Sequence, residues 1–187
     1  IASLITLPVE LNQEQAGGWD SYLVQAADDA YLENVEYGIG IMAEGYTTAD
    51  EIWATLRDKR GYAVVDRLAV PSRSTTNIVI GGPEFSLQGV YLEDETMEPI
   101  RLKVREPNSE ATFEVTIIGV LEQTPISGYG LIASQETLEK GLNTELPAPT
   151  HFVRLAEGVD PTSTSTALES VFLKNGLESV DLIQELR

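Results

Sequence analysis

A glycine-rich run is the first place in this chain where residue types and spacing could support chemistry. Gly38-Ile39-Gly40-Ile41-Met42-Ala43 matches the loose dinucleotide pattern, in which glycines let the backbone approach a pyrophosphate at a helix N-terminus. Here the glycines fall inside an apolar, strand-like run, and the next predicted helix begins only around Ala49. The run therefore favours glycines that pack or bulge within a strand, and we expect no nucleotide cofactor.

Nucleophilic and metal-ion chemistry lack their usual groups. The single histidine, His151, follows a Pro-x-Pro link at the start of a predicted strand, and Ser127 precedes Gly128 without a Gly-x-Ser-x-Gly elbow. There is no cysteine, and the acidic run Glu93-Asp94-Glu95 lacks the alternating spacing of a calcium loop. We expect no catalytic residue, no metal and no cofactor. A carboxylate pair for glycoside hydrolysis stays open, since 30 acidic residues always offer some pair.

A loop after a long apolar strand is the positive candidate. Residues 123–130 place Ile126, Ser127 and Tyr129 in a segment with proline and two glycines. Apolar residues exposed on a loop can anchor a partner protein. The alternative is a connector whose Ile126 and Tyr129 fold back onto the protein.

Charge narrows the class of partner. The 30 acidic and 12 basic residues give a formal charge of −18, which repels nucleic acid and anionic membrane surfaces. The longest apolar runs fall well short of the roughly 20 residues that a membrane-spanning helix needs. The chain opens on strand-like residues without an initiator methionine, so we expect it to be part of a longer protein.

The elements that must position these residues follow a pattern that occurs twice. Residues 37–68 and 151–186 each read as a strand, Ala-Glu-Gly, a helix, a glycine and a strand containing Val-Asp. In the first copy Thr48 and Glu51 form a capping box, and Gly61 provides the exit. In the second, Asp160 caps a helix with Pro161 at its first position, and Gly176 closes it. We expect two related β-α-β units.

The remaining segments are predicted individually. Residues 19–27 suit a short helix, and the polar stretch 71–77 marks a boundary. After Ser134, which caps a short helix that Gly141 ends, the Pro-Ala-Pro link at 147–149 leads to the second unit. The predicted strands between these points are 85–92, 100–105, 112–121 and 130–133.

The predicted fold class is therefore α+β. Residues 1–70 plus 149–187 form a split β-α-β lobe, and residues 71–148 form an inserted β-rich lobe.

Two stretches carry a family resemblance. The strand Thr112–Glu122, the Gly-rich loop, the strand ending in Ile132-Ala133 and the short helix with Leu138 resemble the periplasmic core domain of MacB-like and FtsX-like ABC transporter permeases. The close of the chain, from Phe152-Val153-Arg154-Leu155 to the predicted strand 177–183, resembles the strand-helix-strand that precedes a membrane helix in that family.

The resemblance implies a porter-like lobe with an inserted sabre-like lobe on the extracytoplasmic face of the membrane. It also implies a non-catalytic domain that relays ATP-driven motion, served by a cytoplasmic ABC ATPase, with cargo, an adaptor protein or a second permease copy as further partners. A secreted or surface-anchored binding domain is the alternative, and a carboxylate-based hydrolase comes third.

Overall fold

The structure is a computed structural model of the chain. The residues that it describes are 1–14, 17–74, 84–107, 109–122, 129–143, 146, 149–176 and 178–180.

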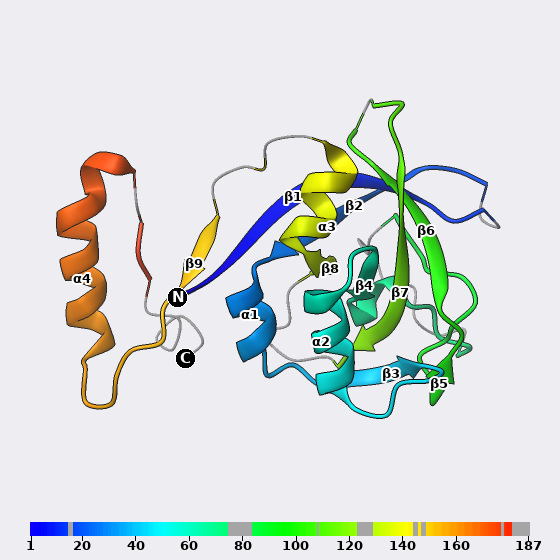
Figure 1. Ribbon diagram of the computed structural model, residues 1–187, viewed down its shortest axis with the longest axis horizontal. Helices are drawn as coiled ribbons and strands as arrows, with labels where there is room; N and C mark the ends of the chain where they lie inside the picture. The colour runs from blue at the N-terminus through cyan, green and yellow to red at the C-terminus, as the bar shows by residue number, and fades with distance from the viewer. Residues whose placement is uncertain are drawn as a thin grey trace. The chain divides into compact units, whose positions relative to one another are not determined.

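The chain contains both strands and short helices, and four consecutive strands, β5 to β8, lie in its middle (Figure 1). The strands are β1 (Ala2–Asn12), β2 (Asp20–Ala27), β3 (Ile39–Ala43), β4 (Tyr62–Val65), β5 (Thr96–Met97), β6 (Ile100–Arg105), β7 (Phe113–Leu121), β8 (Leu131–Ser134) and β9 (Thr150–Phe152). The helices are α1 (Asp29–Asn34), α2 (Ala49–Asp58), α3 (Gln135–Leu142) and α4 (Pro161–Phe172), with single 3-10 turns η1 (Arg67–Ala69) and η2 (Leu173–Asn175). The predicted α+β class is confirmed.

In the described part of the chain, the strands form one sheet that closes on itself. The sheet runs β4-β8-β2-β1-β6-β7-β3-β5, with β9 paired to the start of β1. Because β4 also pairs with β7, the strands β4, β8, β2, β1, β6 and β7 form a closed ring. Closure leaves β3 and β5 as a branch that extends from β7.

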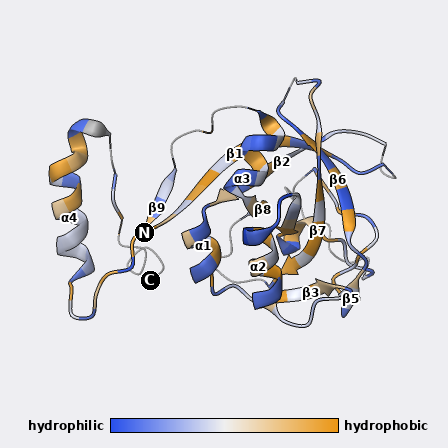
Figure 2. Ribbon diagram, in the orientation of Figure 1, coloured by the Kyte–Doolittle hydropathy of each residue, from blue (hydrophilic) through white to orange (hydrophobic). Residues whose placement is uncertain are grey.

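Strand β7 closes the ring because it has three partners. Residues Phe113–Ile117 pair with β6, and Gly119–Leu121 pair with β3 on the same edge. The opposite edge, Thr116–Val120, pairs in parallel with β4. The register shifts between Ala63 and Val64, a bulge that bends the strand and increases its twist. Figure 2 shows hydrophobic residues along most of β7, whereas α2 also carries hydrophilic stretches.

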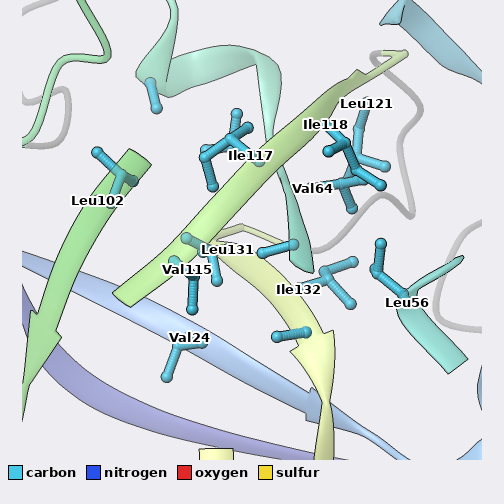
Figure 3. Packing of buried hydrophobic residues seen from close by; sticks show 14 of the residues in the cluster. Val24, Leu56, Val64, Leu102, Val115, Ile117, Ile118, Leu121, Leu131 and Ile132 are labelled. Atoms are coloured by element: carbon cyan, nitrogen blue, oxygen red, sulfur yellow. The ribbon is translucent and has the colours of Figure 1, made fainter. Parts of the chain in front are cut away.

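The apolar core has two layers. Val24, Leu102, Val115, Ile117 and Leu131 come from four strands of the ring, β2, β6, β7 and β8, and are at most 1% exposed (Figure 3). A second group, in which Leu56 of α2 faces Val64 and Ile132, lies between the sheet and the helix. The burial of both layers is the main stabilising contribution to the fold.

Helix α2 begins and packs as its sequence predicts. The Thr48 hydroxyl accepts from the Glu51 amide at 3.2 Å, and Ile52, Trp53 and Leu56 are buried. The Glu51 carboxylate accepts from the amide of Thr47 at 2.7 Å, one residue earlier than the predicted Thr48. Gly61 has φ +80°, the left-handed conformation expected at the exit.

Two predicted helix features are wrong. Residues Asp20–Ala27 form β2, not a helix, because eight consecutive residues pair with β1 and the strand is covered on both faces toward its end. Buried strands of this kind lack a clear alternation, so the sequence pattern resembles a helix. Helix α3 continues past Gly141 and ends at Leu142, with Asn143 in the left-handed conformation.

The predicted strand 85–92 is also wrong. Phe85, Leu87 and Val90 are buried, which accounts for the apolar pattern, but these residues form an irregular segment. Backbone bonds hold it in place, from Leu87 N to the Ala69 carbonyl and from Leu92 N to the Pro71 carbonyl.

The chain divides at a different position from the predicted lobes. Strands β6, β7 and β8, which belong to the predicted insertion 71–148, share one ring with β1, β2 and β4. The compact units are Ile1–Phe152 and Val153–Arg187. The prediction paired strands that are close in sequence, whereas the ring also pairs distant strands, such as β1 with β6 and β2 with β8. Strands β3 and β4 of the first predicted unit lie on opposite edges of β7 and do not pair with each other.

The second unit consists of a capped helix. Asp160 accepts from the Ser163 amide at 2.8 Å, Pro161 opens α4, and Gly176 follows η2 with φ +76°, as predicted. No residue of α4 is buried. Of the predicted strand 177–183, residues 178–180 are described and are not a strand, and the others lie outside the described residues. Among the described residues, no helix has both the length and the hydropathy to cross a bilayer.

Gly119 is predicted to be intolerant of any side chain. A Cβ there would lie 2.9 Å from Ile39 Cγ2 and 3.3 Å from Ile52 Cδ1, where β7 meets β3 and α2. Gly119→Ala should lower the free energy of unfolding by about 1–3 kcal/mol through overpacking, measured by urea denaturation. Gly18→Ala is the control, since a Cβ there meets nothing within 4 Å. Equal stability of the two variants would contradict this packing.

Candidate partner-contact site

The glycine run is occupied by a protein side chain. Gly38 precedes β3 and Gly40 lies within it, and a Cβ on Gly38 would overlap the Glu122 carboxylate. The α2 N-terminus begins only at Ala49. A pyrophosphate at these glycines would meet a carboxylate and no helix dipole, so the physical arrangement disfavours a dinucleotide.

His151 and the acidic run serve structural contacts. His151 Nδ1 lies 2.9 Å from the Ser3 hydroxyl, where β9 pairs with β1. Glu93 accepts from the Ser72 hydroxyl and the Arg73 amide, and the Ser72 bond is the main cause that lowers the pKa of Glu93. No group of three or more His, Cys, Asp or Glu side chains suited to a metal ion occurs among the residues that the structure describes.

Asp94 completes this arrangement. Its carboxylate lies 2.7 Å from the Arg73 guanidinium, which stacks 4.4 Å from the centre of the Tyr91 ring. The acidic run therefore bonds residues 72–73 to residues 93–94.

A shallow hollow between α1 and α3 is also acidic. Asp28, Asp29, Glu136 and Glu139 line it together with Ala30 and Gln135. Asp28 caps α1 by accepting from the Tyr31 amide at 2.7 Å, and Glu136 lies 3.3 Å from Arg60. Asp28, Asp29 and Glu136 lie at helix N-termini, where a carboxylate interacts favourably with the helix dipole, and Glu139 accepts from Gln135 Nε2 at 2.7 Å.

Tyr129 is the one predicted contact residue that the structure describes; Ile126 and Ser127 lie outside the described residues. The Tyr129 side chain is 37% exposed, so it does not fold back fully, and its ring centre lies 5.3 Å from that of Tyr22. Its carbonyl accepts from Gln25 Nε2 at 3.1 Å. Partial burial raises the pKa of the Tyr129 phenol. The residue thus combines a bonded backbone carbonyl with a partly exposed side chain.

A buried carboxylate fixes the backbone beside Tyr129. Asp66 is 4% exposed, and its Oδ2 accepts from the Gly130 amide at 2.7 Å and from the Tyr22 hydroxyl. Its Oδ1 accepts from the Leu68 amide at 2.7 Å. A carboxylate taken out of water needs such bonds, because an unpaired buried charge is strongly unfavourable.

Gly130 fits its position for two reasons. Its φ is +121°, and a Cβ would lie 2.7 Å from the Leu23 carbonyl oxygen, a backbone atom. Only glycine satisfies both constraints. The backbones of Asp66 and Gly130 are also bonded directly, because the Asp66 amide donates to the Gly130 carbonyl at 3.1 Å.

Sequence reasoning missed Asp66 and Tyr22 as site residues. Asp66 entered only as part of the repeated Val-Asp pair, and Tyr22 was placed in a predicted helix. A signal was present, because an aspartate that ends a buried strand before Arg67-Leu68-Ala69 is a typical cap of a short helical turn.

Comparisons with known proteins give similarity at the level of structure. No family model and no curated protein matches the sequence. The extracellular domain of the noncanonical ABC-type transporter YknZ from Gram-positive bacteria is similar, with 11% identity, a TM-score of 0.47, and coverage of 96% of this chain and 80% of that one.

A second similar structure is a domain of a protein assigned as a permease, from Porphyromonas gingivalis. It has 18% identity, a TM-score of 0.45, and coverage of 93% and 69%. Both structures are thus domains of transporter or permease proteins.

The Asp66 contacts predict a graded loss of stability. Asp66→Asn replaces one acceptor oxygen by an NH₂ group facing buried donors, and should lower the free energy of unfolding by about 2–4 kcal/mol. Tyr22→Phe removes one donor and keeps the ring, and should cost about 1–2 kcal/mol. Urea denaturation measures both, with Asp29→Asn as the exposed control. An Asp66→Asn variant as stable as Asp29→Asn would contradict the role of the carboxylate.

Alkaline pH provides a second test. Burial, and then the nearby Asp66 carboxylate, raise the pKa of Tyr22 above its ordinary value. The folded state therefore favours the protonated Tyr22 phenol. The stability that this protonated group contributes is complete below the unfolded-state pKa of about 10 and is lost as the pH rises above it. Each group of this kind adds at most about 1.4 kcal/mol per pH unit to the fall in the free energy of unfolding. Tyr22→Phe should flatten the fall in the free energy of unfolding between about pH 10 and 11. An unchanged slope would contradict the burial of this hydroxyl.

Proposed function

We propose that this chain is a non-catalytic extracytoplasmic domain of an ABC transporter permease subunit, which relays ATP-driven conformational change to partners outside the membrane. The observation that carries the proposal is the order of β7, β8 and α3 between Phe113 and Leu142, which is the order of these elements in the family resemblance. The glycine run, His151 and the acidic run are engaged in structural contacts, which supports a non-catalytic role.

The closed ring suits a relay. A ring in which each strand is bonded to two neighbours resists bending, so a displacement applied at one part of the body moves the whole. A domain of this kind transmits motion from a membrane-embedded part to a bound partner without chemistry of its own.

The partners of the proposed domain are of two kinds. A cytoplasmic ABC ATPase acts through the parent permease, and a cargo or adaptor protein, or a second permease copy, meets the extracytoplasmic surface. Ile126, Ser127 and Tyr129 are the proposed contact residues, supported by the exposed face of Tyr129. The charge of −18 makes nucleic acid an unsuitable partner.

Membrane topology of the parent protein tests the proposal. The full-length protein, carrying a protease site inserted at Gly18, should remain in the membrane after carbonate extraction and be cleaved by protease added to intact spheroplasts. The same site placed in the cytoplasmic ATPase is the control and should stay protected. A parent protein that is released from membranes, or that lacks hydrophobic helices of about 20 residues on both sides of this domain, would contradict the proposal.

A further inference from the structure

We propose that Leu68 and Tyr129 form one contact surface, positioned by Asp66, for a basic polypeptide segment that presents an apolar side chain. The Leu68–Tyr129 surface, defined by these two side chains, deepens the proposed partner contact by adding Leu68 and by naming the chemistry of the partner.

The two residues are joined through a single carboxylate. The Leu68 amide bonds one oxygen of Asp66, and the amide of Gly130, which follows Tyr129, bonds the other. The backbones of η1 and of the residue before β8 are therefore bonded to the same carboxylate. Leu68 is 55% exposed and Tyr129 is 37% exposed.

The other exposed apolar residues of the first unit have different settings. The large hydrophobic residues exposed between Ile1 and Phe152, within the described part, are Ile1, Leu68, Tyr91, Tyr129 and Phe152. Arg73 stacks on Tyr91, Phe152 packs 5.7 Å from Tyr31, and Ile1 is the first residue. Single exposed apolar residues are ordinary on protein surfaces. Leu68 and Tyr129 differ because the amide of Leu68 and the amide of Gly130, which follows Tyr129, bond the same buried carboxylate.

The buried Asp66 carboxylate does more than fill space in the core. A hydrophobic side chain of similar volume would fill the same space without the desolvation cost of a carboxylate. The carboxylate instead fixes the positions of the groups that donate to it, because three donors from β2, η1 and the residue before β8 converge on its two oxygens. Asp66 and Tyr22 are therefore positioning residues, and Tyr22 also supports the Tyr129 ring at 5.3 Å between ring centres.

The net charge of the chain favours a basic partner. A net charge of −18 attracts basic proteins at long range and repels acidic ones. This attraction comes from the chain as a whole, because Arg67, the charged residue adjacent to Leu68 in the sequence, is itself basic. The apolar side chain supplies the contact and the basic flanks supply the steering.

Peptide titration followed by NMR tests the surface on the 187-residue chain. The probe is Ac-Lys-Gly-Leu-Phe-Gly-Lys-NH₂, with a Ser-Ser peptide in place of Leu-Phe as the apolar control and a Glu-flanked peptide as the charge control. The Leu-Phe basic peptide should shift the amide signals of Leu68 and Gly130, and added salt should weaken it. The Ser-Ser and Glu-flanked peptides should bind at least about tenfold more weakly.

Variants separate the surface from its anchor. Leu68→Ser and Tyr129→Ser should each weaken the peptide about tenfold, while Val159→Ser, an exposed apolar control in the second unit, should not. Tyr22→Phe should weaken binding under conditions where the variant is fully folded, which a role in stability alone does not predict.

Three results would overturn the inference: no shift at Leu68 or Gly130, equal affinity of the Leu68→Ser and Val159→Ser variants, or equal affinity for the acidic peptide. A parent protein without membrane helices would instead overturn the permease proposal and leave this binding result standing.

Discussion

The pairing of β7 with three other strands is the constraint on which the rest of the structure depends. One edge is shared between β6 and β3, and the other pairs with β4 and closes the ring. Gly119 makes this possible, because a side chain at the crossing would overlap Ile39 and crowd Ile52. Without the β4–β7 pairing the same strands would form an open sheet, and the inner layer of the core would be exposed along one side.

Ring closure also builds the candidate site. β4 and β8 are antiparallel neighbours, with Val65 opposite Leu131. Asp66 follows Val65 and Gly130 precedes Leu131, so this register sets Asp66 beside Gly130 and lets their backbones bond. The placement of the Asp66 carboxylate beside Gly130 is thus a consequence of how the β4–β8 pairing ends.

Local chemistry was predictable from the sequence, and long-range pairing was not. The caps at Thr48, Ser134 and Asp160 and the strands β6, β7 and β8 depend on neighbouring residues, and the structure has them within one or two positions. β2 resembled a helix because its partners, β1 and β8, cover it on both edges while the core buries most of its side chains. The lobe boundary failed for the same reason, since strands that bond across a hundred residues leave no local signal. Of the site, Tyr129 was predicted, but Asp66 and Leu68 join it only through the β4–β8 register.

Amide hydrogen exchange tests the closed ring most directly. If β4, β7 and β8 form one body with β1 and β2, the amides of Val64, Val120 and Ile132 should exchange with the same free energy of opening as those of β1 and β2, up to the global value. If residues 71–148 form a separate lobe, amides of β6 and β7 should open independently of β1, β2 and β4, at a different denaturant dependence. That second result would contradict the closure by β7.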